Sequence, residues 1–343
     1  MERTSAEIKT AAQGEMLHNR VKKRYKHLKK WASRIGTDVL RLYDRDIPEI
    51  PLVLDLYGGA VSGALYKRPY EKDPGEEASW LRVMSGAVSD ALGISREQVF
   101  IKYRERQRGS TQYQKMGQKK FETEIHEAGL TFRVNLSDYL DTGFFPDRRR
   151  MRSRIRAEAS GKTLLNLFCY TAAFSVCAAA GGAKEIDSVD LSRPYLEWAA
   201  VNFGLNHLRT RRVPPEFLTA RRPPGEGSVP YRLIRADVLS FLDTALKAGL
   251  SWDMIILDPP AFSNSKKMRA TLDVKRDHQS LISQCLSLLK PGGKLWFSAN
   301  ARYFHLDPEK FSGWEVMDLS PLMEDEDFRG KKMPRCYTFT RPS

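Results

Sequence analysis

Residues 164–190 read LLNLFCYTAAFSVCAAAGGAKEIDSVD, and this stretch decides the fold class of the chain. Its start, Leu164–Phe168, is a short apolar run typical of a buried strand. The small residues of Ala172–Ala180 predict a helix, which a Gly-Gly pair then closes. Ile186–Asp190 returns to strand character. A strand, a crossover helix and a second strand together predict a parallel β-α-β unit.

The same alternation continues towards the C-terminus. Further strands are predicted at 231–236, 253–257 and 294–298, and further helices at 194–205, 239–248 and 274–289. Residues 209–230 are rich in Pro, Arg and Gly and are interpreted as an inserted surface loop. Repeated β-α units of this length imply a parallel sheet with helices on both faces, so we predict an α/β domain over residues 141–343.

Two predicted regions precede this domain. Residues 1–37 are expected to contain a basic amphipathic helix, because apolar residues recur every three or four positions within a run of Lys and Arg. The apolar stripe consists of Leu17, Val21, Tyr25, Leu28, Trp31 and Ile35. Residues 38–140 are expected to form a small α+β domain that binds RNA. Its predicted elements are strands 38–43, 51–57, 60–66, 98–104 and 130–136, helix 80–92, and a polar, Gly- and Gln-rich stretch at 107–120.

The composition of the chain limits the classes of partner that it can bind. Lys and Arg total 56 against 42 Asp and Glu, and the net charge of +14 favours a polyanionic partner, either nucleic acid or an anionic membrane surface. No apolar run reaches the roughly 18 residues that a membrane-spanning helix needs. The first 30 residues are polar and basic and lack an apolar signal core. We therefore expect a cytoplasmic protein with no membrane partner.

The cysteine pattern gives no sign of disulfide or metal chemistry. Cys169, Cys177, Cys285 and Cys336 are widely scattered and form no CxxC pair. No Cys/His cluster has the spacing of a zinc site. We expect reduced, mostly buried thiols and no metal ion.

Polar side chains stand at the ends of the predicted strands, where parallel sheets bind ligands. Asn166 lies near the end of the first strand, Asp190 ends the second, and Asp237 follows the third. An acid about 20 residues past the first turn can bind ribose hydroxyls, and Asp237 is placed to receive an adenine amino group. Taken singly, each acid could merely cap the helix that follows it. The first turn lacks the glycines that let backbone approach a pyrophosphate, so NAD and FAD are disfavoured.

The fourth strand ends in Asp258-Pro259-Pro260-Ala261-Phe262. Two prolines restrict the backbone just past the sheet, which would hold Asp258 at the site and offer Phe262 as a flat stacking surface. The alternative for this segment is a loop without a functional role.

These residues resemble the class I S-adenosylmethionine-dependent RNA methyltransferases, and more closely the guanine-N7 (K) half of the bifunctional bacterial 23S rRNA methyltransferases. The resemblance runs from about residue 19 onwards and is carried by RLYD (41–44), RERQ (104–107), YQK (113–115), DYLDTG (138–143), YLEWA (195–199), DPP (258–260), FSNSK (262–266) and RDH (276–278). It implies a Rossmann-like class I methyltransferase sheet, S-adenosylmethionine as cofactor, and 23S rRNA or a precursor of the large ribosomal subunit as partner.

The resemblance also implies a site. Asn166, Asp190 and Asp237 would line the pocket for the methyl donor, and Asp147 and Arg148 would close over it. The residues expected to bind the donor are Phe145, Asp147, Arg148, Asn166, Phe168, Tyr170, Thr171, Asp190, Leu191, Ser192, Asp237, Val238 and Asp258. The expected catalytic residues are Asp258, Phe262 and Asn300. One departure from the family is Ala172-Ala173, where relatives often have glycine.

Several activities remain open at this point. Methylation of cytosine carbon 5 requires a cysteine nucleophile, and the segment Phe297-Ser298-Ala299-Asn300 after the fifth strand has none, so this activity is disfavoured. Guanine N7 has an exposed lone pair and needs no deprotonation before it accepts a methyl group. Methylation of an exocyclic amine suits the DPPAF segment equally well. A non-catalytic RNA-binding module is the alternative outside enzymes.

RNA is expected to lie across the basic N-terminal helix, the small domain and the Arg-rich segments 148–156 and 209–222. For Arg148–Arg150 the alternative is a solvated basic turn. The chain lacks the RNA-binding THUMP module and the second methyltransferase half of the bifunctional proteins, so a stand-alone activity is expected.

Overall fold

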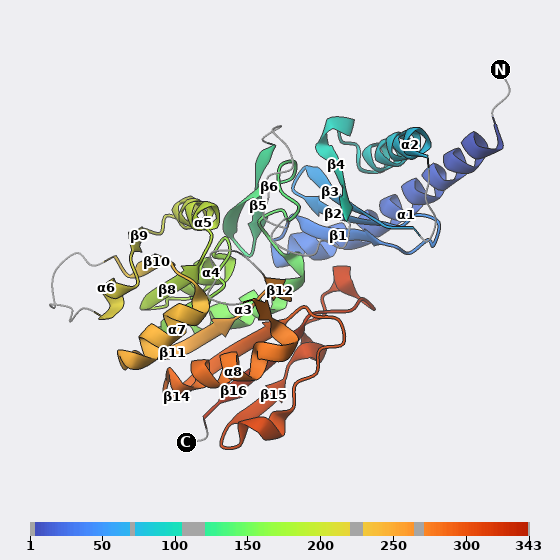
Figure 1. Cartoon of the computed structure of the whole chain (residues 1–343). Coiled ribbons are helices and arrows are strands. Elements are labelled where there is room, and N and C mark those ends of the chain that lie inside the picture. The colour runs from blue at the N-terminus through green and yellow to red at the C-terminus, as the bar shows by residue number, and fades with distance from the viewer. Residues whose placement is uncertain (1–3, 69–72, 105–120, 220–228, 264–270, 342–343) are drawn as a thin grey trace. The chain divides into compact units, whose positions relative to one another are not determined.

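The structure is a computed structural model that describes residues 4–68, 73–104, 121–219, 229–263 and 271–341. The chain divides into two compact units, Met1–Thr142 and Gly143–Ser343 (Figure 1). Some features singled out in the sequence lie outside the described residues: the stretch 107–120 with YQK (113–115), positions 105–107 of RERQ, positions 264–266 of FSNSK, and positions 220–222 of the second Arg-rich segment. In the part of the chain that is described, no helix is long and apolar enough to span a bilayer.

The first unit begins with helix α1, Ser5–Ile35. The helix starts well before its apolar stripe because Thr4 and Glu7 form a capping box that satisfies free N–H groups of the first turn. It ends at Gly36, which adopts the left-handed conformation with a φ of 66°. Local capping chemistry therefore determines both ends of the helix.

The apolar stripe of α1 packs into the core of the first unit. Leu17 and Leu28 are fully buried in one hydrophobic cluster with Trp80 of helix α2 (Pro74–Leu92). Segment 1–37 therefore shares a core with the residues that follow it. The other side of the helix exposes a row of cations, namely Arg20, Lys22, Lys23, Lys26, Lys29, Lys30 and Arg34.

Two sheets complete the first unit. The larger has the strand order β1-β2-β3-β4 and consists of β1 (Val39–Asp44), β2 (Leu52–Tyr57), β3 (Ala60–Tyr66) and β4 (Val99–Arg104). The β3–β4 pair is parallel because α2 forms the crossover between these strands. The smaller is a hairpin of β5 (Glu122–Glu127) and β6 (Leu130–Asn135). Strand β5 was not predicted, because its sequence ETEIHE is mostly charged.

The second unit is built on one eight-stranded sheet with the order β15-β16-β14-β11-β7-β8-β10-β9. Its strands are β7 (Thr163–Leu167), β8 (Glu185–Asp190), β9 (Thr210–Val213), β10 (Tyr231–Arg235), β11 (Trp252–Leu257), β14 (Leu289–Ala299), β15 (Glu315–Asp318) and β16 (Arg335–Thr340). The strands from β14 to β9 are parallel, as the alternation predicts. The expectation of an entirely parallel sheet is wrong at one edge, because β16 pairs antiparallel with both β14 and β15.

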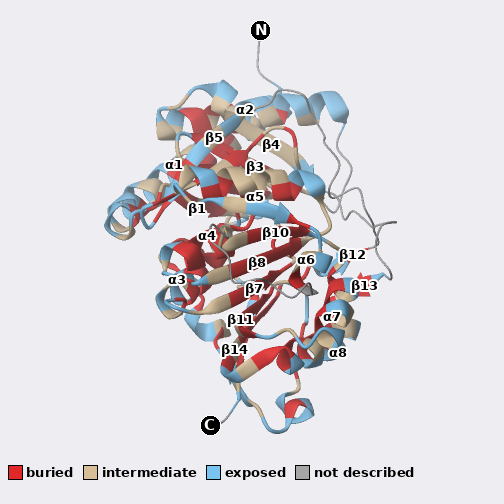
Figure 2. Cartoon of the chain, turned by 90° about the vertical axis from the view of Figure 1, so that its left-hand side faces the viewer, coloured by how far each residue is buried: buried red, intermediate tan, exposed pale blue. Residues whose placement is uncertain are grey.

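Helices lie on both faces of this sheet (Figure 1). One group contains α3 (Arg149–Glu158), α4 (Ala173–Ala180) and α5 (Arg193–Leu205), and the other contains α7 (Val238–Lys247) and α8 (Val274–Ser287). Alternate side chains of β7 point to opposite faces of the sheet. Leu165 and Leu167 belong to the hydrophobic core that includes residues of α7 and α8, whereas Asn166 contacts α4 on the other face. The central strands are buried along most of their length (Figure 2).

Two interpretations of Arg-rich segments are wrong. Part of the 209–230 segment, expected as a loop, is edge strand β9 followed by helix α6 (Glu216–Thr219). Arg148–Arg150 is not a solvated turn, because Arg148 and Arg149 are buried; further along the segment Arg152 is buried too, whereas Arg150 and Arg154 are exposed. Arg149 donates to Asp325 at 3.1 Å and to Asp327 at 2.9 Å. Such arginines are committed to internal partners and cannot contact phosphates.

Candidate active site

The candidate site lies in the second unit, at the edge of the sheet where the parallel strands end. Leu257 of β11 pairs with Leu167 of β7, which pairs with Val189 of β8. Because these partners are the last or next-to-last residues of their strands, the following segments emerge side by side. The sheet thus places Asp190 and Asp258 at one edge, as the sequence predicts.

The turn after β7 has an uncommon backbone. Phe168, Tyr170 and Ala172 have φ values of 55°, 52° and 61°, in the left-handed region that favours glycine. The conformation of Ala172 is one that glycine adopts without strain. Three such residues in one turn are a local store of strain, of a kind that gathers at functional sites.

Asp190 holds this turn in place. Its carboxylate accepts hydrogen bonds from the Tyr170 N–H at 2.9 Å and from the Ser192 N–H at 2.8 Å. Burial raises the pKa of Asp190 from 3.8 to about 6, and the backbone hydrogen bonds oppose this shift only in part. Since a folded-state pKa above the unfolded value favours the protonated carboxyl, ionisation of Asp190 costs folding free energy as pH rises from about 4 to about 6.

Asn166 lies beneath the same turn, on the face of the sheet that α4 covers. Its Nδ2 donates to Ser175 Oγ at 2.8 Å, and Ser175 Oγ lies 2.8 Å from Ser188 Oγ. Asn166 Oδ1 is buried and has no hydrogen-bond partner among the described residues. The two serines were not singled out from the sequence, because nothing in their spacing distinguishes them from other buried hydroxyls.

The segment before α3 is anchored on the β7 turn. Thr171 Oγ1 donates to the Gly143 carbonyl at 2.6 Å, and the rings of Phe145 and Tyr170 lie 5.4 Å apart. Gly143 has a φ of 92°, and a Cβ at this position would meet the ring of Trp198 at 2.2 Å. Only glycine fits here, so the DYLDTG string ends in a residue that the packing requires.

Arg148 and Asp258 form a partly buried ion pair that the sequence did not predict. Arg148 Nε and one terminal nitrogen donate to the two carboxylate oxygens of Asp258 at 3.1 and 3.0 Å. Arg148 also donates to Asp147 Oδ2 at 3.3 Å. These two acids raise the pKa of the Arg148 guanidinium further above its ordinary value, despite burial, so its charge is permanent. The pair fixes the orientation of Asp258 from a segment 110 residues away in sequence.

The segments near Asp258 carry the other residues that are expected to contact the base receiving the methyl group. Phe262 lies in the short strand β12 (Phe262–Ser263), which pairs with β13 (Leu272–Asp273), and its ring is 44% exposed. Asn300 follows β14 and is exposed. Both can therefore reach a ligand outside the chain.

The other residues that are expected to bind the methyl donor differ in how far their side chains are buried. Asp237 precedes α7, is half-buried and accepts from Ser240 Oγ at 3.2 Å. Val238 is buried in the core, and Phe168 packs against the same cluster, so these two side chains are largely taken up by packing. Leu191 is half-buried and its carbonyl accepts from Arg235 at 3.3 Å. Ser192 caps α5 through the Tyr195 N–H.

The thiols of the second unit are unsuited to nucleophilic chemistry. All four cysteines are buried. Burial raises the pKa of the Cys169 and Cys285 thiols well above the ordinary value, and that of Cys336 to about 12. A thiol that stays protonated at neutral pH is a poor nucleophile. Among the described residues, no group of three or more His, Cys, Asp or Glu side chains is placed to hold a metal ion.

The polar atoms at this edge of the sheet suit a methyl donor that carries positive charge. Asp147 Oδ1 and Asn166 Oδ1 are buried acceptors without a partner among the described residues, and buried acceptors of this kind normally find one. Asp190 adds a carboxylate with room for further donors. S-adenosylmethionine offers a sulfonium, an ammonium group and ribose hydroxyls, so the residues present fit this molecule.

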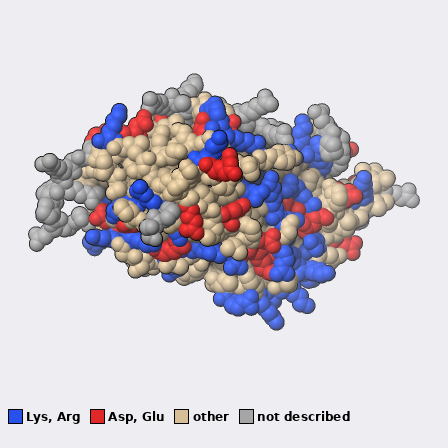
Figure 3. Space-filling view, turned by 90° about the horizontal axis from the view of Figure 1, so that it is seen from below, with Lys and Arg blue, Asp and Glu red and all other residues tan. Residues whose placement is uncertain are grey.

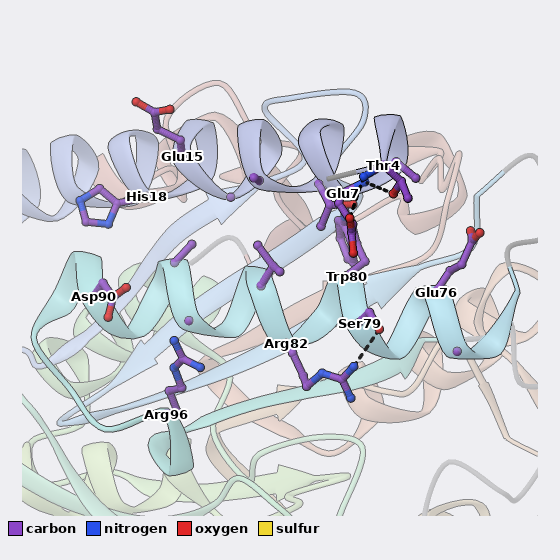
Figure 4. Close-up of a pocket in the computed structure, with 18 residues that line it drawn as sticks. Thr4, Glu7, Glu15, His18, Glu76, Ser79, Trp80, Arg82, Asp90 and Arg96 are labelled. Atoms are coloured by element: carbon purple, nitrogen blue, oxygen red, sulfur yellow. Dashed lines mark hydrogen bonds between the residues drawn. The ribbon is translucent and has the colours of Figure 1, made fainter. Parts of the chain in front are cut away.

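A pocket in the first unit is a separate feature. It lies between α1 and α2 and is lined by both acidic and basic side chains, among them Glu7, Glu15, Asp90, Arg82 and Arg96 (Figure 4). The helices approach closely at Gly14, where a Cβ would meet Val83 at 2.9 Å. None of the residues expected to bind the donor or the acceptor lines this pocket.

Comparison with known proteins places the chain in a family. Residues 45–308 match the S-adenosylmethionine-dependent methyltransferase family. The chain is 42% identical over 325 residues to the Ribosomal RNA large subunit methyltransferase K of Neisseria meningitidis, covering 95% of this chain and 87% of that protein. It is 41% identical over 337 residues to the Ribosomal RNA large subunit methyltransferase K/L of Ectopseudomonas mendocina, covering 98% of this chain but 43% of that protein.

Solved structures share the fold. A methyltransferase solved in complex with SAH superposes with a TM-score of 0.71 at 24% identity, covering 95% of this chain and 81% of that one. The SAM-dependent methyltransferase of Agrobacterium tumefaciens superposes with a TM-score of 0.56 at 18% identity, covering 85% and 88%. The predicted fold class, a Rossmann-like sheet with helices on both faces, is confirmed.

The family match and the neighbour with bound SAH also confirm the predicted cofactor, S-adenosylmethionine. The similarity to the K and K/L proteins confirms the resemblance noted in the sequence. The chain therefore belongs to the family of S-adenosylmethionine-dependent methyltransferases.

Proposed function

We propose that this protein methylates N7 of a guanine in 23S rRNA, with S-adenosylmethionine as the donor. The names of the K and K/L relatives support an rRNA substrate. The observation that carries the proposal is the Arg148–Asp258 ion pair, followed in DPPAF by the exposed Phe262. This arrangement can hold a base in place, and the described part of the site has no activated thiol.

The arrangement suits N7 because this atom needs only alignment. S-adenosylmethionine supplies an electrophilic methyl group, and the N7 lone pair is already available at neutral pH. Asp258, oriented by Arg148, accepts hydrogen bonds from the amino edge of guanine, and Phe262 stacks on the base. Fixing the two reactants in this way can contribute up to roughly 7–11 kcal/mol to lowering the barrier. A base within a duplex must first be flipped out.

A single atom in the RNA tests this proposal. A 23S rRNA transcript made with 7-deazaguanosine keeps its Watson–Crick edge but has carbon in place of N7. We expect the enzyme to methylate the ordinary transcript and to leave the 7-deaza transcript unmethylated, as measured by transfer of radiolabelled methyl groups. Equal labelling of both transcripts would contradict the choice of N7.

Methylation of an exocyclic amine is the second candidate, because the same acid and the same aromatic ring could hold that group. It predicts that the 7-deaza transcript is a full substrate, since the amine is intact. Methylation of cytosine carbon 5 gives the same result with that transcript but requires a thiol. A variant with all four cysteines replaced by Ser or Ala is therefore expected to keep measurable transfer if it folds. Its inactivity in a folded protein, together with a trapped covalent RNA adduct, would revive the cytosine mechanism.

The raised pKa of Asp190 makes donor binding depend on pH. In this proposal the ribose hydroxyls donate to the ionised carboxylate, so donor binding and proton binding at Asp190 oppose each other. Because its pKa is about 6, affinity for S-adenosylmethionine is expected to rise between pH 5 and 6.5, approaching tenfold per pH unit below the pKa, and to level off above pH 7. Calorimetry across this range measures it, with Asp190→Asn as the control that removes the dependence. A flat profile for the unchanged protein would contradict the role of Asp190.

The surface proposed for RNA is revised by the structure. The cationic face of α1 is exposed and stays in the proposal. In the 148–156 segment the exposed Arg150 and Arg154 stay in the proposal, whereas Arg148, Arg149 and Arg152 leave it because they are buried. On the face shown in Figure 3, Lys and Arg gather in several groups with Asp and Glu between them. Phosphate contacts from such groups supply affinity but carry little sequence information.

A further inference from the structure

The turn after β14 presents an aromatic ring to solvent. Tyr303 is 75% exposed, more than any other large apolar or aromatic side chain in the described ranges. Its neighbour Phe304 is only 5% exposed, and the Phe304 ring packs edge-on against His278 with centroids 4.9 Å apart. The turn therefore buries one ring and presents the other.

This presentation requires a strained backbone. Tyr303 has a φ of 59°, a left-handed conformation that bulky residues rarely adopt. The turn is closed by the Phe304 N–H, which donates to the Ala301 carbonyl at 3.2 Å. Glycine would adopt this conformation without strain. The ring contacts two cations of the chain but buries little of its surface, so a contact outside the chain is a further physical reason for tyrosine at this position.

Two cations flank the exposed ring. The guanidinium carbon of Arg302 lies 4.9 Å from the ring centroid of Tyr303, and Lys332 Nζ lies 5.4 Å from it. These residues come from separate segments, which meet because Ala299 at the end of β14 pairs with Arg335 at the start of β16. An exposed flat ring next to positive charges is the combination with which proteins bind single-stranded nucleic acid.

The segment that carries Tyr303 leaves the sheet at the same edge as Asp258. Leu257 and Phe297 are partners in the parallel β11–β14 pair, so both strands end at the edge that carries Asp258. Tyr303 stands three residues beyond Asn300 on the segment that leaves this edge. A nucleotide next to the target base could therefore reach it.

We propose that Tyr303, Arg302 and Lys332 form a platform for single-stranded RNA. In this inference the Tyr303 ring stacks on an unpaired base that flanks the target, and the two cations contact the neighbouring phosphates. It rests on the proposed function only in requiring an RNA substrate, and it does not depend on which atom is methylated. Base pairing and stacking in a duplex would hide the faces of that base, so the platform selects unpaired segments.

Substitutions at one position separate the ring from the backbone. Tyr303→Gly removes the ring and suits the left-handed φ, so its melting temperature is expected to equal or exceed that of the unchanged protein. Its affinity for a fluorescently labelled single-stranded oligoadenylate is expected to fall about 5- to 150-fold in anisotropy titrations, the range for loss of one stacked base. Tyr303→Phe keeps the ring and is expected to bind like the unchanged protein.

The role of the cations is tested by how the affinity for single-stranded RNA depends on salt concentration. Lys332→Ala is expected to lower the slope of log affinity against log salt concentration by about 0.7, the value for one phosphate contact to a single strand. Tyr303→Gly should leave this slope unchanged, because stacking releases no counterions. Met317→Ala is the matched control: Met317 is a half-exposed apolar side chain on β15, and its loss should change neither affinity nor slope.

Methyl transfer to 23S rRNA distinguishes a binding role from a purely structural one. Tyr303→Gly is expected to raise KM for the RNA while leaving kcat and the affinity for S-adenosylmethionine unchanged. Binding of oligoadenylate by Tyr303→Gly as tight as that of the unchanged protein would overturn the platform. Loss of kcat with unaltered RNA affinity would also overturn it. A methylated product other than 7-methylguanosine, formed by the unchanged protein, would contradict the proposed function and leave these binding results to stand alone.

Discussion

Replacement of Asp258 by alanine is expected to lower single-turnover methyl transfer about 100-fold while leaving the affinity for S-adenosylmethionine nearly unchanged. The reason is that Asp258 is assigned to the acceptor base, and a displacement of the reacting group by about 1 Å can reduce the rate roughly 10²-fold. The free energy of unfolding should also fall, by about 1.5–3 kcal/mol, because the buried Arg148 loses its bidentate partner and keeps only Asp147. Calorimetry with the donor and rapid-quench transfer to rRNA measure the two functional effects.

A double variant separates the two losses. Arg148→Met combined with Asp258→Ala removes both charges of the pair, so part of the lost stability should return; the rest stays lost because Asp147 no longer has Arg148 as its partner. Transfer should stay about 100-fold low, because no acid remains to orient the base. The same variant tests whether Arg148 contacts the donor: as a positioning residue for Asp258, its loss leaves donor affinity intact. Equal losses of donor affinity and transfer in Asp258→Ala would make Asp258 a donor ligand, and no loss of either would reduce DPPAF to a structural loop.

Asp190→Ala is expected to weaken the binding of S-adenosylmethionine by about 1.5–3 kcal/mol, or roughly 10- to 150-fold. Two effects contribute. The ribose hydroxyls lose their acceptor, and the N–H groups of Tyr170 and Ser192 lose the carboxylate that joins the two strand-end turns. Because Tyr170 is held at a φ of 52°, release of its N–H allows the turn to relax away from the binding conformation.

The matched control for this variant is Glu315→Ala, which removes an exposed acid from edge strand β15. It should leave donor affinity and thermal stability unchanged. Calorimetric affinity in Asp190→Ala equal to that of the unchanged protein would show that this strand end does not hold the donor.

The sequence predicted the parts of the fold that are local and periodic. The apolar runs that became β7, β10 and β11 are short and bounded by turns, and each matches its predicted strand to within one residue. Strand β9 was missed because the sequence TRRV is short and charged, and its place in the sheet comes only from pairing with β10. Strand β16 was missed because nothing local shows that the chain returns beside β14.

The sequence predicted those site residues that directly follow a parallel strand, because their positions in the chain fix where they lie. Asp190 and Asp258 could be placed at one edge of the sheet because parallel strands end together. The partner of Asp258 could not be foreseen, because Arg148 reaches it from before α3, across 110 residues of sequence. The same holds for the platform at Tyr303: its exposure depends on a single left-handed residue, and Lys332 reaches it only through the antiparallel return of the chain.

Identification of the product tests the central claim most directly. The unchanged protein is incubated with S-adenosylmethionine and deproteinised 23S rRNA, and the RNA is digested to nucleosides and analysed by mass spectrometry. The account predicts 7-methylguanosine as the new nucleoside, formed at one position when the digest is mapped. N2-methylguanosine, 5-methylcytidine, or the absence of any methylated nucleoside would contradict it.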